Sequence, residues 1–108
     1  MILRTADELT VTLDEKHWTT HIVAHHPELA DHWNRVIEVL KNPHGVYRSK
    51  RGKSTRISMR VFHGIAVSDN VFERMSLLVH VREDGGFVVT AYFAAAMWRS
   101  LGEQLWPL

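Results

Sequence analysis

Half of the histidines in this chain fall in one short stretch, at His17, His21, His25 and His26. Histidine is the side chain whose ordinary pKa lies nearest neutral pH, so a group of them can transfer protons, bind anions when charged or bind a metal when neutral. On a helix that turns by about 100° per residue, His17, His21 and His25 fall in one stripe at the edge of an apolar row. We therefore expect imidazoles that are partly buried and still accessible, which is where pKa values shift and substrates bind.

Three interpretations of the cluster stand side by side. In the first, the imidazoles only pack and form local hydrogen bonds. In the second, His21 and His25 have the i, i+4 spacing of a helical zinc pair, with Glu28 or His26 as a third ligand, although Ile22 stands where a metalloprotease has glutamate. In the third, histidine is the acid or base in metal-free cleavage of a phosphodiester, and basic residues hold the phosphate.

A basic segment follows. No aspartate or glutamate lies between Glu38 and Asp69, and this interval holds seven lysines and arginines. They are Lys41, Arg48, Lys50, Arg51, Lys53, Arg56 and Arg60. Such a block is either a solvated loop with basic flanks or a surface that contacts a phosphate backbone.

A predicted hairpin places further polar residues on one face of a sheet. Apolar residues alternate on both sides of the turn at 84–86, and burial favours the register that puts Val79 opposite Ala91. In that register His80 lies opposite Thr90, on the face away from the helices, and Tyr92 lies on the same face. We expect Arg56, Ser58 and Arg60 of the neighbouring strand to join them there.

The elements that position these groups change type along the chain. The T-x-x-E pattern of Thr12 and Glu15 predicts a helix that begins near residue 13 and ends at Pro27, and an apolar stripe predicts a second helix from Pro27 to Asn42. From Val46 onward the period becomes two, which is typical of strands. The segment 94–108 is predicted as a short C-terminal helix, with Met97, Leu101 and Leu105 on one face. The predicted fold class is α+β: two N-terminal helices packed on an antiparallel sheet of about four strands, in one domain over residues 1–108.

Composition narrows the function classes. The chain has 108 residues, a net charge of +1 and no cysteine, so disulfides, thiolate metal sites and thiol nucleophiles are excluded. No segment approaches the roughly 20 apolar residues of a membrane span. The N-terminus carries Arg4, Asp7 and Glu8 and no apolar run, so we expect no secretory signal and a cytoplasmic location.

The order of several short motifs resembles a known family. The first is Trp18-x-x-His21-Ile22-x-x-x-His26-Pro27-Glu28, followed by Asn42-Pro43-x-x-Val46 and Arg48-Ser49, and then by Val88-Val89-Thr90-Ala91-Tyr92. Over about residues 11–93 this series is similar to the phage-associated branch of the barnase–EndoU–colicin–RelE (BECR) nuclease superfamily. The resemblance implies helices packed on an antiparallel sheet and a metal-independent endoribonuclease, in many cases a toxin. It also implies that the active residues are His21 and His26, Arg48 with Ser49, and Thr90 with Tyr92, and His25 stands where the family has a basic residue before H-P-E.

Chemistry gives the same prediction from the residues themselves. RNA carries its own nucleophile, so its cleavage needs a base, positive charge at the phosphate and an acid for the leaving oxygen, and no cofactor. We expect His21 or His26 as base and His80 or Tyr92 as acid, while Tyr47 or Tyr92 stacks on bases. The remaining candidates for substrate binding are Arg48, Ser49, Lys53, Arg56 and Arg60.

The expected partners are RNA and, for a toxin or prophage nuclease, an antitoxin or immunity protein. Two alternatives remain open at this point. One is a non-catalytic module of the same fold that binds nucleic acid or a partner, and the other is a zinc hydrolase with histidine ligands.

Overall fold

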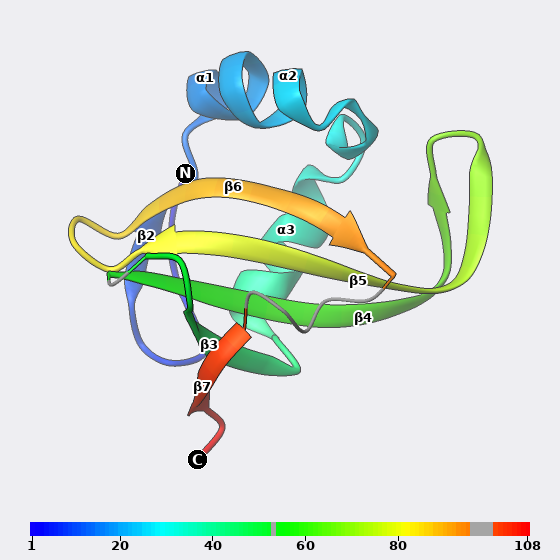
Figure 1. The fold of residues 1–108 in the computed structure, drawn as a ribbon. Coiled ribbons are helices and arrows are strands. Elements are labelled where there is room, and N and C mark those ends of the chain that lie inside the picture. The colour runs from blue at the N-terminus through cyan, green and yellow to red at the C-terminus, as the bar shows by residue number, and fades with distance from the viewer. Residues whose placement is uncertain (53, 96–100) are drawn as a thin grey trace.

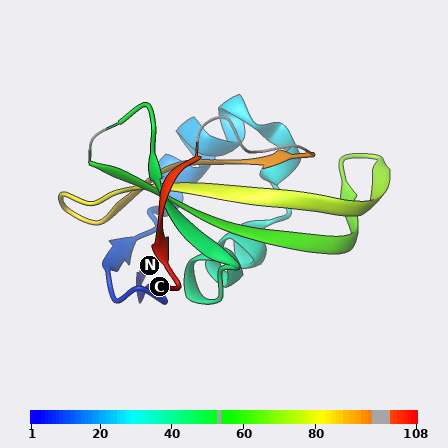
Figure 2. The ribbon, with the colours of Figure 1, turned by 60° about the horizontal axis from the view of Figure 1, so that its bottom comes forward.

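The protein is built on one mixed β-sheet. The computed structural model describes residues 1–52, 54–95 and 101–108, and strands make up half of them. The strands are β1 (Ile2–Arg4), β2 (Thr10–Thr12), β3 (Gly45–Ser49), β4 (Thr55–Val67), β5 (Asn70–Arg82), β6 (Phe87–Ala94) and β7 (Leu101–Trp106). They pair in the order β1-β2-β6-β5-β4-β3-β7, and the distal end of the long β4–β5 hairpin curls away from the rest of the sheet (Figures 1 and 2).

The helical segments lie between β2 and β3. Three of them, α1 (Glu15–His17), the π-helical turn η1 (Trp18–Ile22) and α2 (Val23–His25), run on without a break. After them come the 3₁₀ turn η2 (Pro27–Leu29) and the helix α3 (Trp33–Lys41). The Asp14 carboxylate accepts a hydrogen bond from the His17 N–H at 2.8 Å, so the cap is Asp14 and not the predicted Thr12.

The helices cover one face of the sheet. In Figure 1 the segment from α1 to α2 runs along β6, and α3 lies behind the sheet. Their apolar side chains meet those of the central strands, because Trp18, Ile22 and Val36 share a buried cluster with Leu77 and Val79. A smaller cluster on the opposite face joins Leu101 of β7 to Ile57, Met59 and Leu78. Apolar burial therefore stabilises both faces of the central strands.

The predicted register of the β5–β6 hairpin is confirmed over its central part. Val79 lies opposite Ala91 and His80 opposite Thr90. The register shifts after His80, so Arg82 lies opposite Phe87 and not opposite Val88. A β-bulge of this kind adds one residue to a strand and breaks the simple alternation on which the sequence argument depends.

The predicted fold class is wrong. The sheet has seven strands in the described residues, and it is mixed because β2 pairs with β6 in parallel at Thr12 and Phe87. The expected C-terminal helix is also wrong where the structure describes it, since Leu101–Trp106 is a strand beside β3, and Met97 lies outside the described residues. Leu101 and Leu105 are four residues apart, a spacing that keeps side chains on one face of either a helix or a strand.

The second predicted helix is shorter than expected. It begins at Trp33, because Pro27–Leu29 form a 3₁₀ turn and His32 leaves the helical region with a φ of −117°. Its end at Lys41 agrees with the prediction from Asn42 and Pro43. Within the described residues, the helices are all too short or too polar to cross a bilayer.

Candidate functional site

Three of the predicted residues come together at the end of the histidine-rich helix. The ring of His26 lies 5.7 Å from the ring of Tyr92, centroid to centroid. The Tyr92 hydroxyl lies 3.0 Å from Nε2 of His80. These residues, which we call the His26–Tyr92–His80 cluster, come from the helix end, from β6 and from β5. Two imidazoles and a phenol are thus brought into one row from positions up to 66 residues apart in the sequence.

The neighbours of the cluster follow from the local structure. Pro27 ends α2 and leaves His26 with an extended φ of −133°, which turns its ring out of the helical stripe. Nδ1 of His26 lies 3.5 Å from a carboxylate oxygen of Glu28 in the next turn. Thr90 lies opposite His80 in the β5–β6 pair, as predicted. Among the sequence candidates, His26, His80, Thr90 and Tyr92 therefore share one neighbourhood.

His80 is neutral at physiological pH. Burial lowers its pKa to about 4, and the nearby Arg51 guanidinium acts in the same direction. A neutral imidazole holds one N–H donor and one bare acceptor nitrogen, so Nε2 can donate to the Tyr92 oxygen or accept from its hydroxyl. Arg51 was part of the basic segment but not one of the site residues predicted from the sequence. The sequence does not show which of the seven basic residues lies near His80. The fold shows that Arg51 lies close enough to lower the pKa of His80.

The other histidines of the stretch form a separate ladder along the helix. The rings of His17 and His21 stack at 4.8 Å, and those of His21 and His25 lie 4.6 Å apart. His17 donates through Nε2 to the Val89 carbonyl of β6 at 2.9 Å, and His25 donates through Nδ1 to the His21 carbonyl at 2.7 Å. His21, a predicted catalytic residue, contacts its helix neighbours and does not join the cluster. His26 is therefore the histidine of the motif that meets β6.

The predicted arginines of β4 lie on the wrong face. Ile57 is opposite His80, whereas Arg56 is opposite Val81 and Arg60 is opposite Leu77. Because residues directly opposite each other share a face, Arg56 and Arg60 point to the side that the helices cover. Ser58, between them, is on the same face and buried. The expectation that these three residues join His80 is wrong.

These arginines are neutralised by carboxylates. Arg56 forms a short hydrogen-bonded ion pair with Asp7, and its Nε lies 3.4 Å from Glu83. Arg48 donates to the same Glu83 carboxylate at 3.1 Å. Arg60 contacts Glu38 at 3.5 Å and donates to the Asn42 carbonyl at 2.7 Å. The charges that were predicted to hold a phosphate are in this structure engaged in ion pairs within the protein.

The remaining candidates have mixed outcomes. Ser49 is buried, and its hydroxyl accepts a hydrogen bond from the Arg51 N–H at 3.2 Å. That bond holds the turn that presents Arg51. Tyr47 packs against the smaller apolar cluster on the His80 face, and Lys53 lies outside the described residues.

The geometry does not assemble a zinc site. Among residues 1–52, 54–95 and 101–108, no three or more histidine, aspartate or glutamate side chains are placed to hold a metal ion together. The rings of His21 and His25, the predicted pair, face each other at 4.6 Å. Glu28, one expected third ligand, contacts His26 instead.

Comparison of this chain with protein-family models, with curated proteins and with solved structures finds no match.

Proposed function

We propose that this protein is a metal-independent endoribonuclease that acts at the His26–Tyr92–His80 cluster. The observation that carries the proposal is the contact of two imidazoles and a phenol, on three different elements, beside the positive charge of Arg51. RNA is the expected substrate class because its 2′-hydroxyl supplies the nucleophile, so the protein needs only proton transfer and charge. The resemblance to BECR nucleases points in the same direction, and we propose a cytoplasmic location for the activity.

His26 is the general base in this proposal. It removes the proton of the 2′-hydroxyl, whose oxygen attacks phosphorus while the bond from phosphorus to the 5′-oxygen breaks. Glu28, at 3.5 Å, stabilises the imidazolium that forms. The products are a 2′,3′-cyclic phosphate and a 5′-hydroxyl.

Tyr92 is the general acid. Its hydroxyl proton goes to the leaving 5′-oxygen, and Nε2–H of neutral His80, 3.0 Å away, donates to the phenolate that remains. The positive charge of Arg51 lowers the energy of that phenolate and of the phosphate oxygens. Exchange with water afterwards restores the proton on Tyr92 and removes the one on His26.

Cleavage of a purified RNA with and without EDTA tests the proposal. We expect wild-type cleavage in both conditions and a loss of about 10²–10⁴-fold for His26→Ala and for Tyr92→Phe, because each removes a proton-transfer group. His63→Ala is the matched control, since His63 is an exposed histidine on the distal part of β4. Circular dichroism of each variant checks whether the fold is retained.

Three results would contradict the proposal. They are no cleavage by the wild type, equal cleavage by wild type and His26→Ala, or cleavage that EDTA abolishes. RNA binding that weakens with salt and gives no product would favour the non-catalytic binding module. The ion pairs of Arg48, Arg56 and Arg60 weigh against that alternative, because a phosphate would have to displace carboxylates already bound to them.

A further inference from the structure

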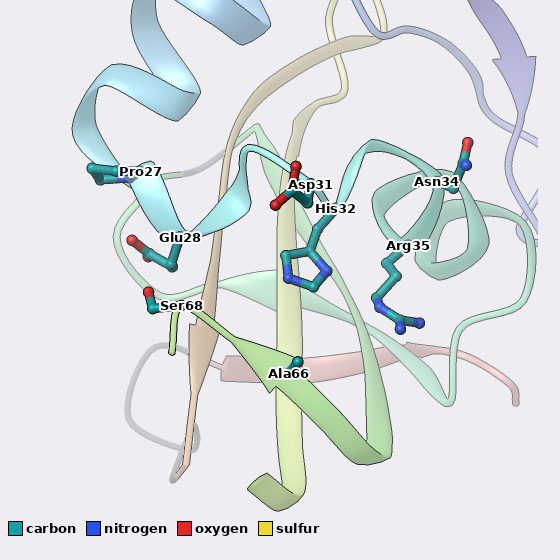
Figure 3. Close-up of a pocket in the computed structure, with 8 residues that line it drawn as sticks. All are labelled: Pro27, Glu28, Asp31, His32, Asn34, Arg35, Ala66 and Ser68. Atoms are coloured by element: carbon teal, nitrogen blue, oxygen red, sulfur yellow. The ribbon is translucent and has the colours of Figure 1, made fainter. Parts of the chain in front are cut away.

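A polar cavity of about 560 Å³ lies next to the proposed catalytic cluster. It is open to solvent and is lined by η2, by the start of α3 and by the distal end of β4, as Figure 3 shows. Its lining residues are Pro27, Glu28, Asp31, His32, Asn34, Arg35, Ala66 and Ser68. Glu28 belongs both to this lining and to the catalytic cluster, because its carboxylate lies 3.5 Å from Nδ1 of His26. A molecule in the cavity is therefore a neighbour of the group that we propose as the base.

His32 is the most unusual residue of the lining. Its side chain is buried, with 7% exposure, yet Nδ1 has no hydrogen-bond partner. Buried polar atoms are nearly always paired, so an unpaired one calls for a reason. His32 also occupies the N-cap position of α3, and its side chain does not cap the helix. Nothing in the fold of the described residues uses this nitrogen.

The protonation of His32 makes that nitrogen an acceptor. Burial lowers its pKa, and the neighbouring Arg35 lowers it further. The ring also hydrogen-bonds the Ala66 backbone, which favours the protonated form and so identifies the ring as donor to the carbonyl. Since Nδ1 is unpaired, Nε2 carries that proton, and Nδ1 of the neutral ring is a bare acceptor that its surroundings cover. Figure 3 shows the ring among the residues that line the cavity.

The rest of the lining offers both acceptors and donors. Asp31 and Glu28 contribute carboxylates, while Arg35 and the Asn34 amide supply donors. A matching ligand must present N–H donors toward the carboxylates, and an acceptor toward Arg35 or Asn34. Adenine, cytosine and guanine each carry an exocyclic amino group next to a ring or carbonyl acceptor, whereas uracil carries carbonyl oxygens in the place of the amino group.

We propose that this cavity is the subsite for a nucleobase with an exocyclic amino group, on one side of the scissile phosphate. The proposal rests on the function proposed above, because it assigns the cavity to the same RNA. Uracil is disfavoured there because its oxygens would face carboxylates and leave their desolvation uncompensated. The cavity thus gives the enzyme a preference among bases that the catalytic cluster alone does not supply.

Two measurements test it, one with catalysis and one without. The first compares cleavage of the sixteen dinucleoside monophosphates. We expect uridine at one of the two positions to reduce kcat/KM by about tenfold or more, the worth of one hydrogen bond to a charged group. The second titrates the protein with the 5′-monophosphates of adenosine, cytidine, guanosine and uridine, and follows backbone amide shifts of Asp31–Arg35 and Ala66–Ser68.

Asp31→Asn is the variant to compare, because Asp31 is exposed and its change leaves the core intact. It should remove most of the preference in both measurements, while Asp84→Asn, an exposed aspartate in the β5–β6 turn, should retain it. His32→Phe provides a second variant that fills the ring volume and removes the acceptor. If His32→Phe unfolds the chain, the comparison of Asp31→Asn with Asp84→Asn still tests whether the cavity sets the base preference.

The outcomes separate the two proposals. Cleavage without any base preference, or a preference unchanged in Asp31→Asn, overturns the subsite and leaves the endoribonuclease standing. Selective binding of amino-bearing nucleotides that Asp31→Asn removes, with no cleavage of any RNA, supports the subsite and overturns the catalytic proposal. Equal binding of all four nucleotides overturns the subsite whatever the activity.

Discussion

At the scale of single residues, His80 links the proposed chemistry to stability. Its pKa is lowered from 6.5 to about 4, mainly because burial disfavours the charged ring. In the unfolded chain the same ring titrates near its ordinary value. Between these two pKa values the unfolded state binds a proton that the folded state does not, so the free energy of unfolding falls as the pH drops from about 6.5 toward 4.

Replacement of His80 therefore changes the pH dependence of stability. We expect His80→Gln to flatten the decrease in unfolding free energy between pH 6.5 and 4, a decrease on the order of 1–3 kcal/mol for this one group. His32 and His44, whose pKa values are also lowered by burial, keep part of the slope. Urea denaturation at a series of pH values measures how the unfolding free energy changes with pH, and His63→Gln, at an exposed position, is the control. A slope equal to that of the wild type would show that His80 is not the group responsible.

The face of a residue was predicted correctly where the register of a single hairpin determines it. Alternation of apolar side chains fixes which face His80, Thr90 and Tyr92 share, because only one register buries the apolar set. The prediction for the arginines of β4 was wrong because the face on which they lie depends on how β4 pairs with its neighbours. The apolar residues of β4 lie mostly at odd positions, so the pattern assigns the even-numbered arginines to the open face. The structure instead packs Ile57 and Met59 with Leu101 on that face, and a covering strand there cannot be read from the alternation in β4.

At the scale of elements, the close pairing of β2 with β6 depends on Gly86. Its carbonyl accepts the Thr12 N–H at 2.6 Å, and it adopts a φ of +57°. A Cβ at this position would lie 2.0 Å from the Thr10 carbonyl oxygen, which belongs to the backbone and cannot rotate away. Gly85 adopts a φ of +81° in the same turn, but a Cβ there meets nothing within 4 Å.

This pair of glycines allows backbone strain to be separated from the clash. We expect Gly85→Ala to cost roughly 1–2 kcal/mol, the usual penalty for a left-handed conformation with a Cβ. Gly86→Ala should cost clearly more, because β2 must also move away from β6. The two unfolding free energies, measured side by side, check this. Equal losses would mean that the contact between β2 and β6 contributes little to stability.

Element prediction worked best for the long strands and worst for the short ones. The 13-residue strands β4 and β5 and their neighbour β6 contain several cycles of alternation. β1 and β2 have three residues each, too few to show a period. The π turn at Trp18–Ile22 also has no signal in a pattern based on the α-helical period.

At the scale of the whole molecule, one ion-pair network joins distant segments. Asp7 in the β1–β2 connection binds Arg56 of β4, and Glu83 after β5 contacts both Arg56 and Arg48 of β3. The Asp7 side chain is only 9% exposed, and its other oxygen accepts a hydrogen bond from the Thr5 hydroxyl. The network accounts for two of the seven basic residues of the segment, Arg48 and Arg56, without any external phosphate.

Loss of the Asp7 charge should therefore destabilise the fold. Asp7→Asn leaves the largely buried Arg56 short of one negative charge, and we expect a loss of about 3 kcal/mol in unfolding free energy. Asp84→Asn, at an exposed turn position, should change it by less than about 0.5 kcal/mol. Chemical denaturation gives both values. A small effect at Asp7 would mean that Glu83 alone balances both arginines.

The helix beside β6 has a consequence for self-association. In the described part of the chain, β6 has a strand on this side only at Phe87, and the Val89 carbonyl is occupied by the imidazole of His17. A strand edge with free carbonyls and N–H groups accepts another chain as an added strand, the first step of aggregation. Because His17 occupies one carbonyl of this edge, a change that detaches the helix would open the edge to pairing with another chain as well as reduce stability.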